Sequence, residues 1–160
     1  MSGRKKFLVA LKERLGSIKE QNGYPLTVQK IFLNDLTRLS IATPKIDCPA
    51  IEIIQDTESY DIKHQHMIIS SSIFLRLVHK EHTSDEDMEV FKSAVIRCLY
   101  KDSYGTGRQV ALAPLLSAEG GFTNSVIRLK ECVSDLGMIE ANRVYVVHFI
   151  AEYHINIYDF

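Results

Sequence analysis

The chain has 160 residues, of which 46% are hydrophobic and 24% are charged, and its formal net charge is −1. This composition excludes a disordered chain, and it excludes a protein whose whole surface attracts nucleic acid or membrane. A chain of this length builds one hydrophobic core, so we expect a single domain over residues 1–160.

The beginning of the chain and its cysteines indicate a protein that folds in a cytosol. The basic residues 4–6 precede an apolar run of only five residues, shorter than the roughly 7–15 of a signal peptide. No apolar run approaches the ~18 residues of a membrane span. Cys48, Cys98 and Cys132 are odd in number and form no C-x-x-C pair, which predicts reduced thiols.

The first elements of the chain are a helix and a short strand. Apolar residues recur at helical spacing with charged residues between them, which predicts an amphipathic helix over residues 4–21. Asn22-Gly23 supplies a left-handed stop. Residues 27–33 then form a short strand, and residues 34–48 form a connection long enough to be a functional loop.

Two further strands are expected in the middle of the chain. Pro49 introduces a short strand over residues 50–54, because proline is permitted at the first position of a strand. Residues 65–79 alternate between apolar and polar side chains. That alternation predicts a long strand with one face exposed to water.

A second helix follows these strands. Thr83 and Glu86 have the spacing of a capping box, and the helix continues to about Lys101. Residues 102–121 contain four glycines and a proline around a short apolar segment. We expect them to form loops around one or two helical turns.

The last two strands form a hairpin and complete the fold class. Residues 126–133 and 143–158 are both strands, and the apolar positions of the second line one face without a gap. No βαβ rhythm or internal repeat is present. The order of elements predicts an α+β fold, an antiparallel β-sheet with helices packed on one face.

Six histidines raise the question of a metal site. His64 and His66 form an H-x-H pair with Asp61 nearby, and we expect the two imidazoles to share a strand face. His148 and His154 stand about 20 Å apart along one strand, so a single ion does not bind both. The H-x-H pair lacks the third and fourth ligands of a zinc site. Solvated histidines are the favoured interpretation, with a metal site or a pH-sensitive subunit contact as alternatives.

Enzyme signatures are missing from the sequence. The glycine-rich segment 105–108 follows a helix and lacks the Lys-Ser/Thr ending of a phosphate-binding loop. No G-x-S-x-G or H-E-x-x-H motif is present. Four acids are interpreted as solvated side chains of an exposed connection: Glu52, Asp56, Glu58 and Asp61. We therefore expect no catalytic residue, no metal and no cofactor.

Charge is unevenly distributed along the chain. Residues 1–20 carry a net charge of +4 and residues 51–89 a net charge of −6, whereas residues 21–50 and 90–160 are close to neutral. This difference is either ordinary surface variation or the mark of a subunit with opposite patches. Opposite patches dock head to tail, which closes a ring if the rotation allows.

The order of these features resembles a known family. An N-terminal helix ends at Asn22-Gly23-Tyr24, a strand follows, and then comes the segment Cys48-Pro49-Ala50-Ile51-Glu52-Ile53. A long strand, an acid-capped helix and a tyrosine-rich final strand complete the series. The chain resembles the tail terminator (tail completion) proteins of bacteriophages with long non-contractile tails, and most of all those of the T-five-like group.

The resemblance implies a structural virion protein, not an enzyme, with a fold related to tail-tube subunits. Such proteins form a homohexameric ring that caps the head-proximal end of the tail tube. The ring ends polymerisation and presents a surface to the neck or head-completion protein, and DNA passes through its channel without specific binding. The implied partners are other copies of the chain, the tail tube protein and the neck or head-completion protein. The copies are expected to stay monomeric in solution until the tube end templates the ring. No membrane is involved, and assembly takes place in the host cytoplasm.

Loops carry contacts on a rigid sheet, so the two long loops are the expected contact regions. The interface residues expected there are Arg38, Lys45, Tyr104 and Arg108. Two alternatives stay open. One is another tail or neck ring component, such as a tube subunit or a head–tail connector, and the other is a small metal-binding enzyme that uses His64 and His66.

Overall fold

The fold is seen in a computed structural model that describes residues 3–33, 47–100, 110–111, 125–133, 138–139 and 142–159. Within these ranges it contains two α-helices, α1 (Gly3–Gly16) and α3 (Asp85–Leu99), and two short 3-10 helices at Glu20–Asn22 and Ile157–Asp159. The strands are β1 (Lys30–Leu33), β2 (Ala50–Lys63), β3 (His66–Lys80), β4 (Val110–Ala111), β5 (Ser125–Val133), β6 (Met138–Ile139) and β7 (Asn142–Asn156).

All seven strands join one mixed sheet in the order β1-β2-β3-β7-β5-β4, with β6 paired to the beginning of β7. Every pairing is antiparallel except that of β1 with β2, which is parallel. The expected α+β class is confirmed, and the prediction of a wholly antiparallel sheet is wrong at this edge. The two strands are parallel because both start at the same end of the sheet, with Lys30, the first residue of β1, opposite Ala50, the first residue of β2.

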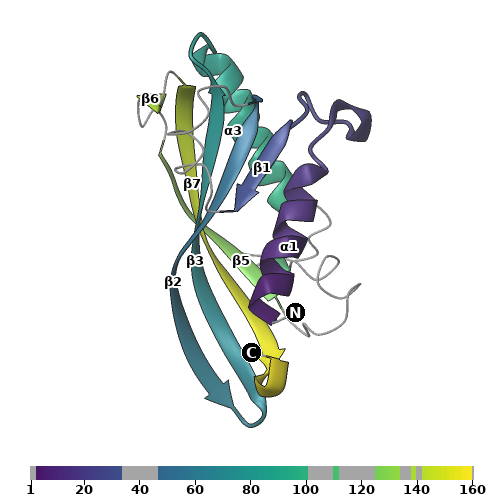
Figure 1. Cartoon of the computed structure of the whole chain (residues 1–160), viewed down its shortest axis with the longest axis vertical. Helices are drawn as coiled ribbons and strands as arrows, with labels where there is room; N and C mark the ends of the chain where they lie inside the picture. Colours follow the sequence, from purple (N-terminus) through teal and green to yellow (C-terminus); the bar gives the residue numbers. More distant parts are fainter. Residues whose placement is uncertain are drawn as a thin grey trace.

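Both helices cover the same face of the sheet, as expected (Figure 1). One continuous core joins them to the odd-numbered positions of β3 and β7, and its largest fully buried side chains include Phe7, Phe91, Phe149 and Tyr153. The rings of Phe7 and Tyr153 stack with their centroids 4.3 Å apart. The helix-covered face therefore holds most of the apolar surface buried in this fold.

The helix ends differ from the predicted ones. α1 ends at Gly16, not at residue 21, because Gly and Ser are weak helix formers and the amide of Ser17 turns back to the carbonyl of Arg14 at 3.0 Å. A separate 3-10 turn follows, and Gly23 ends it in the left-handed conformation with φ 83°. At α3 the cap is Ser84, not Thr83, since its Oγ accepts from the amide of Asp87 at 3.1 Å.

The two central strands agree with their predicted ranges, and β2 does not. β2 runs to Lys63, nine residues beyond the predicted end at Ile54, so Asp56, Glu58 and Asp61 lie on a strand and not in a connection. The register slips between Gln55 and Glu58, where two residues of β2 face one residue of β3. This β-bulge turns the side chains of β2 to the opposite faces, which breaks the alternation in the sequence.

A second bulge lies at the same level on the other side of the central strands. In β5 the extra residue is Lys130, between the partners of Phe149 and His148. We call this level, around Ser72 of β3, the waist. Bulges increase the local twist of a sheet, and the strands cross one another at the waist in Figure 1.

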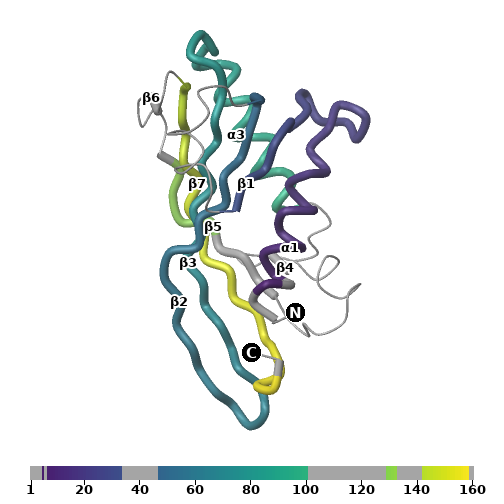
Figure 2. The backbone as a smooth tube through the Cα atoms, viewed as in Figure 1, coloured from purple at the N-terminus to yellow at the C-terminus, as the bar shows by residue number. Residues whose placement is uncertain are grey.

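Below the waist, the β2–β3 hairpin extends past the first turn of α1 (Figures 1 and 2). We call residues 56–70 of this hairpin the arm. It continues the long pairing of β3 with β7, whose register runs without a break from His66 opposite Asn156 to Lys80 opposite Asn142. A continuous ladder of this length holds the arm firmly to the helix-covered half of the molecule.

The face opposite the helices, here called the open face, carries a small second cluster near the end of the sheet that holds β1. Its buried members are Ala50, Val78, Val144 and Val146. Glu52 lies beside them at 1% exposure, so the prediction that it is a solvated acid is wrong. Arg76 supplies its partner, at 3.2 Å between Nη1 and Oε1.

Candidate subunit interface

The four expected contact residues, Arg38, Lys45, Tyr104 and Arg108, lie outside the described residues, as does the 105–108 segment. The candidate contact surfaces considered next are therefore those of the described helices and strands. Two of them have the character of contact surfaces. One is the outer edge of the arm, and the other is a groove between α1 and β1.

The outer edge of β2 below the waist is uncovered by any strand in the described ranges. β1 pairs only with residues 50–53 of β2, and no other described strand lies on that side. A strand edge of this kind presents a row of backbone N–H and C=O groups. Such an edge adds a strand from another chain readily, which makes the arm a candidate for contact between subunits.

The arm also exposes large apolar side chains. Tyr60 is 49% exposed and Ile62 is 57% exposed. Because of the bulge, both lie on the helix side of the sheet, opposite Ile69 and Met67. They continue a row of apolar side chains that is buried on β3 and β7 and emerges at the sheet edge. Tyr158, at 83% exposure, lies just beyond the end of β7.

The second surface is a groove of about 570 Å³ between α1 and β1. Its volume is within the range that binding clefts take, roughly 300–1,000 Å³. β1 is the first strand of the sheet, so its outer edge carries no strand in the described ranges. The apolar side chains along the groove are Val9, Val28, Ile31 and Leu33.

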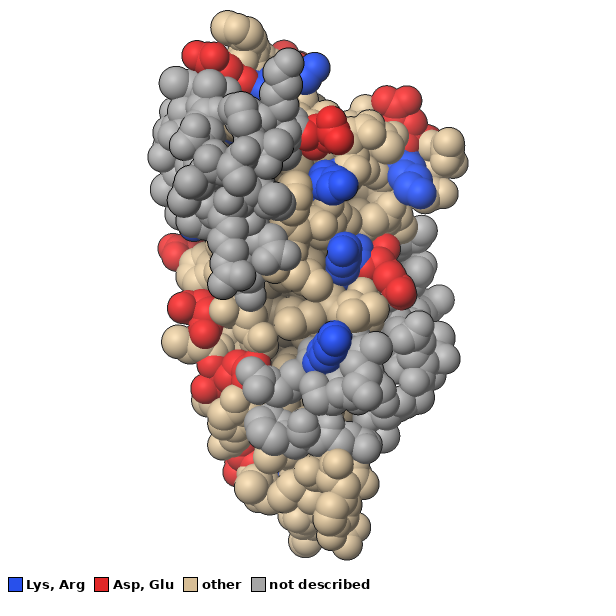
Figure 3. Space-filling model, in the orientation of Figure 1, with Lys and Arg blue, Asp and Glu red and all other residues tan. Residues whose placement is uncertain are grey.

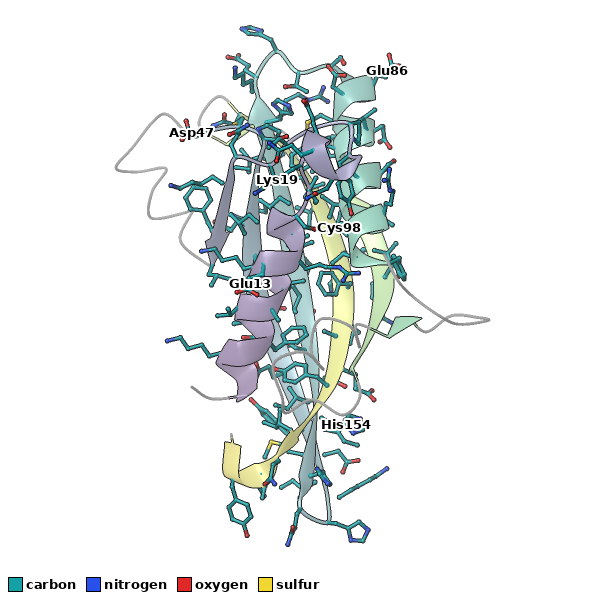
Figure 4. The ribbon with its side chains drawn as sticks, turned by 90° about the vertical axis from the view of Figure 1, so that its right-hand side faces the viewer. Glu13, Lys19, Asp47, Glu86, Cys98 and His154 are labelled. Atoms are coloured by element: carbon teal, nitrogen blue, oxygen red, sulfur yellow. The ribbon has the colours of Figure 1, made fainter. Side chains whose placement is uncertain are left out.

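Charged side chains flank the same groove. Lys12 and Glu13 come from α1, Lys30 comes from β1, and all three are exposed. Figure 4 shows Glu13 on the part of α1 that lies beside β1. In Figure 3, Lys and Arg side chains form a column over α1 and β1, and Asp and Glu side chains follow the margin where the arm lies. Basic side chains thus predominate at the groove and acidic ones along the arm, although Glu13 lies at the groove and Lys63 on the arm.

Not all of the basic N-terminal segment contributes to this column. Arg14 is 9% exposed, and its Nε donates to the carbonyl of Cys98 at 3.0 Å. Cys98 belongs to α3, and Figure 4 shows it on the side of that helix that faces α1. Nearby, the guanidinium of Arg97 lies 4.7 Å from the ring centroid of Tyr24, and burial, together with Cys98, raises the pKa of Tyr24 to about 12. These groups join the two helices and are not part of the candidate interface.

The histidine pair does not form the expected arrangement. His64 lies in the two-residue turn between β2 and β3 with φ 57°, whereas His66 begins β3, so the two do not share a strand face. Across the described part of the chain, no three His, Cys, Asp or Glu side chains group as metal ligands do. His148 and His154 do lie on one face, the open face, and Figure 4 shows His154 on the lower part of the strands.

The sequence analysis missed a polar trio on the open face, at the waist. Ser72, His148 and Glu131 come from β3, β7 and β5 and meet there through the register of those strands. Ser72 Oγ lies 2.7 Å from His148 Nε2, and Glu131 Oε1 lies 3.8 Å from His148 Nδ1. The order matches a nucleophile, a base and an orienting acid.

The geometry of this trio fits packing better than catalysis. Glu131 is beyond hydrogen-bond distance of the imidazole, and its side chain is 66% exposed. Ser72 stands in the middle of a long strand, where backbone N–H groups serve the sheet and not an oxyanion. The imidazole stacks on Phe74 with centroids 4.2 Å apart. The hydroxyl therefore provides a partner for a half-buried histidine.

The three cysteines are free thiols, and none of them pairs with another. Burial raises the pKa of Cys48 and of Cys132, which keeps both in the protonated, poorly nucleophilic form at neutral pH. They are not candidates for a reactive site.

Comparison with models of known protein families gave no match, and comparison with curated protein sequences gave none either. Within the described ranges, neither α-helix has the length and apolarity to cross a lipid bilayer.

Proposed function

We propose that this chain is the tail terminator subunit of a bacteriophage with a long non-contractile tail. In this proposal, copies of the chain form a ring at the head-proximal end of the tail tube, where the ring ends tube polymerisation and joins the neck. The role is structural, not enzymatic, and no metal or cofactor takes part. The proposal rests on the resemblance stated above and on one structural observation.

That observation is the placement of two strand edges that no strand in the described ranges covers. β1 and the arm of β2 belong to the same edge of the sheet, and the twist at the waist turns them to opposite sides of the molecule (Figure 1). A ring subunit needs two different surfaces on opposite sides, because each copy meets one neighbour with each of them. This chain presents such a pair, with opposite charge (Figure 3).

The open face is compatible with a passage for DNA. Its exposed and half-buried side chains below the waist are mostly uncharged or acidic, for example Ser70 and Glu152, with Lys63 as a cation near the turn. Two basic residues of β3 lie on this face above the waist: Arg76 is paired with Glu52, and Lys80 is exposed at the end of the strand. Each phosphate contact adds grip on the polyanion, so a lining of this kind lets DNA slide.

The proposal also names the surfaces above and below the ring. The tail tube protein and the neck or head-completion protein would meet the loops that carry Arg38 and Lys45 or Tyr104 and Arg108. These axial contacts stay a prediction of the sequence, and the virion is where the protein is expected.

The decisive experiment disrupts the gene for this chain in its phage and measures tails by electron microscopy, with a plasmid copy of the gene as the complementation control. The proposal predicts tails of uncontrolled length that are not joined to heads. Loss of a tube subunit would instead leave no tails, and loss of a head–tail connector would leave tails of normal length. Either result, or normal virions, would overturn the proposal. Antibody labelling of complemented virions should place the protein at the head-proximal end of the tail.

A further inference from the structure

We propose that the arm of one copy docks into the α1/β1 groove of a second copy, so that β2 of the first extends the sheet of the second at β1. This inference deepens the proposed function, because it names the contact between subunits, and it rests on that function for the closed ring. Without the tube end the contact is expected to be weak, so it is tested without a phage by trapping it through cross-linking of concentrated protein.

The first support is that the two edges fit as strands. β1 is a four-residue strand at the border of the sheet, and the arm is an extended strand with its outer edge uncovered in the described ranges. Pairing the two satisfies backbone groups on both sides through a regular ladder. The four residues of β1 span about 13 Å, which four or five residues of the arm match.

The second support is the match of apolar side chains. Tyr60 and Ile62 stand on alternate positions of the arm, so both point to the same face of the strand, and about half of each is exposed. The groove offers apolar walls between α1 and β1, among them Val9, Ile31 and Leu33. Placing the two side chains in the groove removes apolar surface from water on both copies.

The third support is the match of charge. The arm carries Asp56, Glu58 and Asp61 against the single cation Lys63, a net charge of −2 from residue 56 to residue 63. The groove carries Lys12 and Lys30 against Glu13. Complementary charge of this kind steers the encounter and selects the partner, and it weakens as salt rises.

The twist decides how the copies are related. Above the waist β1 lies on one side of β2, and below the waist β2 itself forms the opposite margin of the molecule (Figure 1). The arm and the groove of one copy therefore face away from each other. Two copies that exchanged arms would need both surfaces on one side, so the geometry favours head-to-tail contacts that continue from copy to copy.

The test is cross-linking of concentrated purified protein with a short bismaleimide. One variant carries Ile62→Cys in the arm, a second carries Lys12→Cys at the groove, and a third carries both; all of the changed side chains are exposed. Each single variant alone should give no cross-linked product above that of the wild type, whose native thiols are the background. A mixture of the two should give dimers, and the double variant should give a ladder of higher oligomers that weakens at high salt.

The matched control pairs Ile62→Cys with Val90→Cys, which places the second thiol on α3 at 37% exposure and away from the groove. An equal ladder from this control, or no ladder from the first pair at any concentration, would overturn the proposal. A double variant that stops at dimers would also overturn it, because reciprocal exchange of arms gives that result.

A charge exchange gives a second readout. Lys30→Glu, introduced into the double-cysteine variant, in which Lys12 is already replaced, should abolish the ladder, and adding Asp56→Lys with Asp61→Lys should restore it. Failure here is distinguishable from failure of the proposed function. A ladder together with normal tails in the gene-disrupted phage would refute the proposed function and support the contact. Tails of uncontrolled length without a ladder would refute the contact alone.

Discussion

Glu52 of β2 and Arg76 of β3 form an ion pair across the open face of the sheet, with Nη1 and Oε1 3.2 Å apart. The Glu52 side chain is almost fully buried, and the Arg76 side chain is 30% exposed. A buried charge is costly without its partner. Replacing one residue of the pair should therefore cost more stability than the ion pair itself contributes.

Removing the cation should therefore destabilise the fold. We expect Arg76→Met to lower the free energy of unfolding by about 2 kcal/mol, because Glu52 keeps its place and loses an opposite charge. Urea denaturation followed by circular dichroism measures the loss. The double variant Glu52→Leu with Arg76→Met should recover most of it, and a double variant as unstable as the single one would contradict the explanation.

The stacked pair of Phe7 and Tyr153 should be a major source of stability in α1. Phe7→Ala removes a ring that is 1% exposed, and we expect a loss of about 4 kcal/mol, since the cavity adds to the lost burial. Val90→Ala on α3, where the side chain is 37% exposed, is the control and should change the free energy by less than about 1 kcal/mol. Similar losses in the two variants would show that α1 is not anchored through this ring.

His79 should make the stability depend on pH. Burial lowers the pKa of His79 below its usual value near 6.5, with Asp87 opposing this and Lys80 adding to it. Its Nδ1 accepts from the amide of Lys80 at 2.8 Å, which favours the neutral ring. The folded state therefore takes up the proton at lower pH than the unfolded chain, so this contribution is complete above about pH 6.5 and is lost as the pH falls through the folded pKa.

The measurement compares the wild type with His79→Gln in urea between pH 8 and pH 5. The wild type should lose more stability than the variant over this range. At pH 8, where the imidazole is neutral in both states, the difference between the proteins serves as the baseline. An unchanged difference from pH 8 to pH 5 would rule out a role for this ring.

The bulge in β2 should contribute to the twist that places the arm. Deleting Thr57 removes one of the two residues that face a single residue of β3, so Asp56 lies opposite Ser72, and Glu58 and the later residues keep their partners and faces. We expect a change of less than about 2 kcal/mol in the free energy of unfolding, and a weaker cross-linked ladder from the double-cysteine variant because the extra twist is lost. Ser59→Ala, which keeps the bulge, is the control, and a deletion variant whose ladder equals that of the control would show that the bulge does not place the arm.

The parts of the fold that the sequence predicted best are those whose pattern is uninterrupted. β3 and β7 agree with their predicted ranges to within two residues, because each keeps one buried face along its length, which is apolar apart from Ser71 of β3. α3 agrees for the same reason, with six buried side chains at helical spacing. In these elements local pattern and tertiary burial point to the same answer.

β2 and the edge strand could not be predicted in the same way. The apolar positions of β2 are odd before the bulge and even after it, so the alternation ends at Gln55 and the acids beyond it resemble a loop. The parallel direction of β1 depends on where the chain returns after Leu33, and a four-residue pattern is the same in either direction.

The candidate interface was hidden from the sequence for a further reason. The α1/β1 groove and the arm depend on which strand edge stays uncovered, and coverage is a property of the whole sheet. Ser72, His148 and Glu131 likewise meet only through the register of three strands, without any spacing in the chain that marks them. The opposite net charges of residues 1–20 and residues 51–89 were the feature of the sequence that pointed to these two surfaces.

The pair of bulges at one level separates the molecule into two halves with different constraints. Helices cover one face of the sheet above the waist and, through Phe7 of α1, Tyr153 just below it, whereas the end of the hairpin can gain or lose pairs of residues at its turn without disturbing these contacts. A two-residue change keeps every side chain on its face, because the strand repeat is two. The length of the arm is thus a dimension of this fold that can change independently of the core, and under the proposed ring such changes would be made at the turn formed by His64 and Gln65.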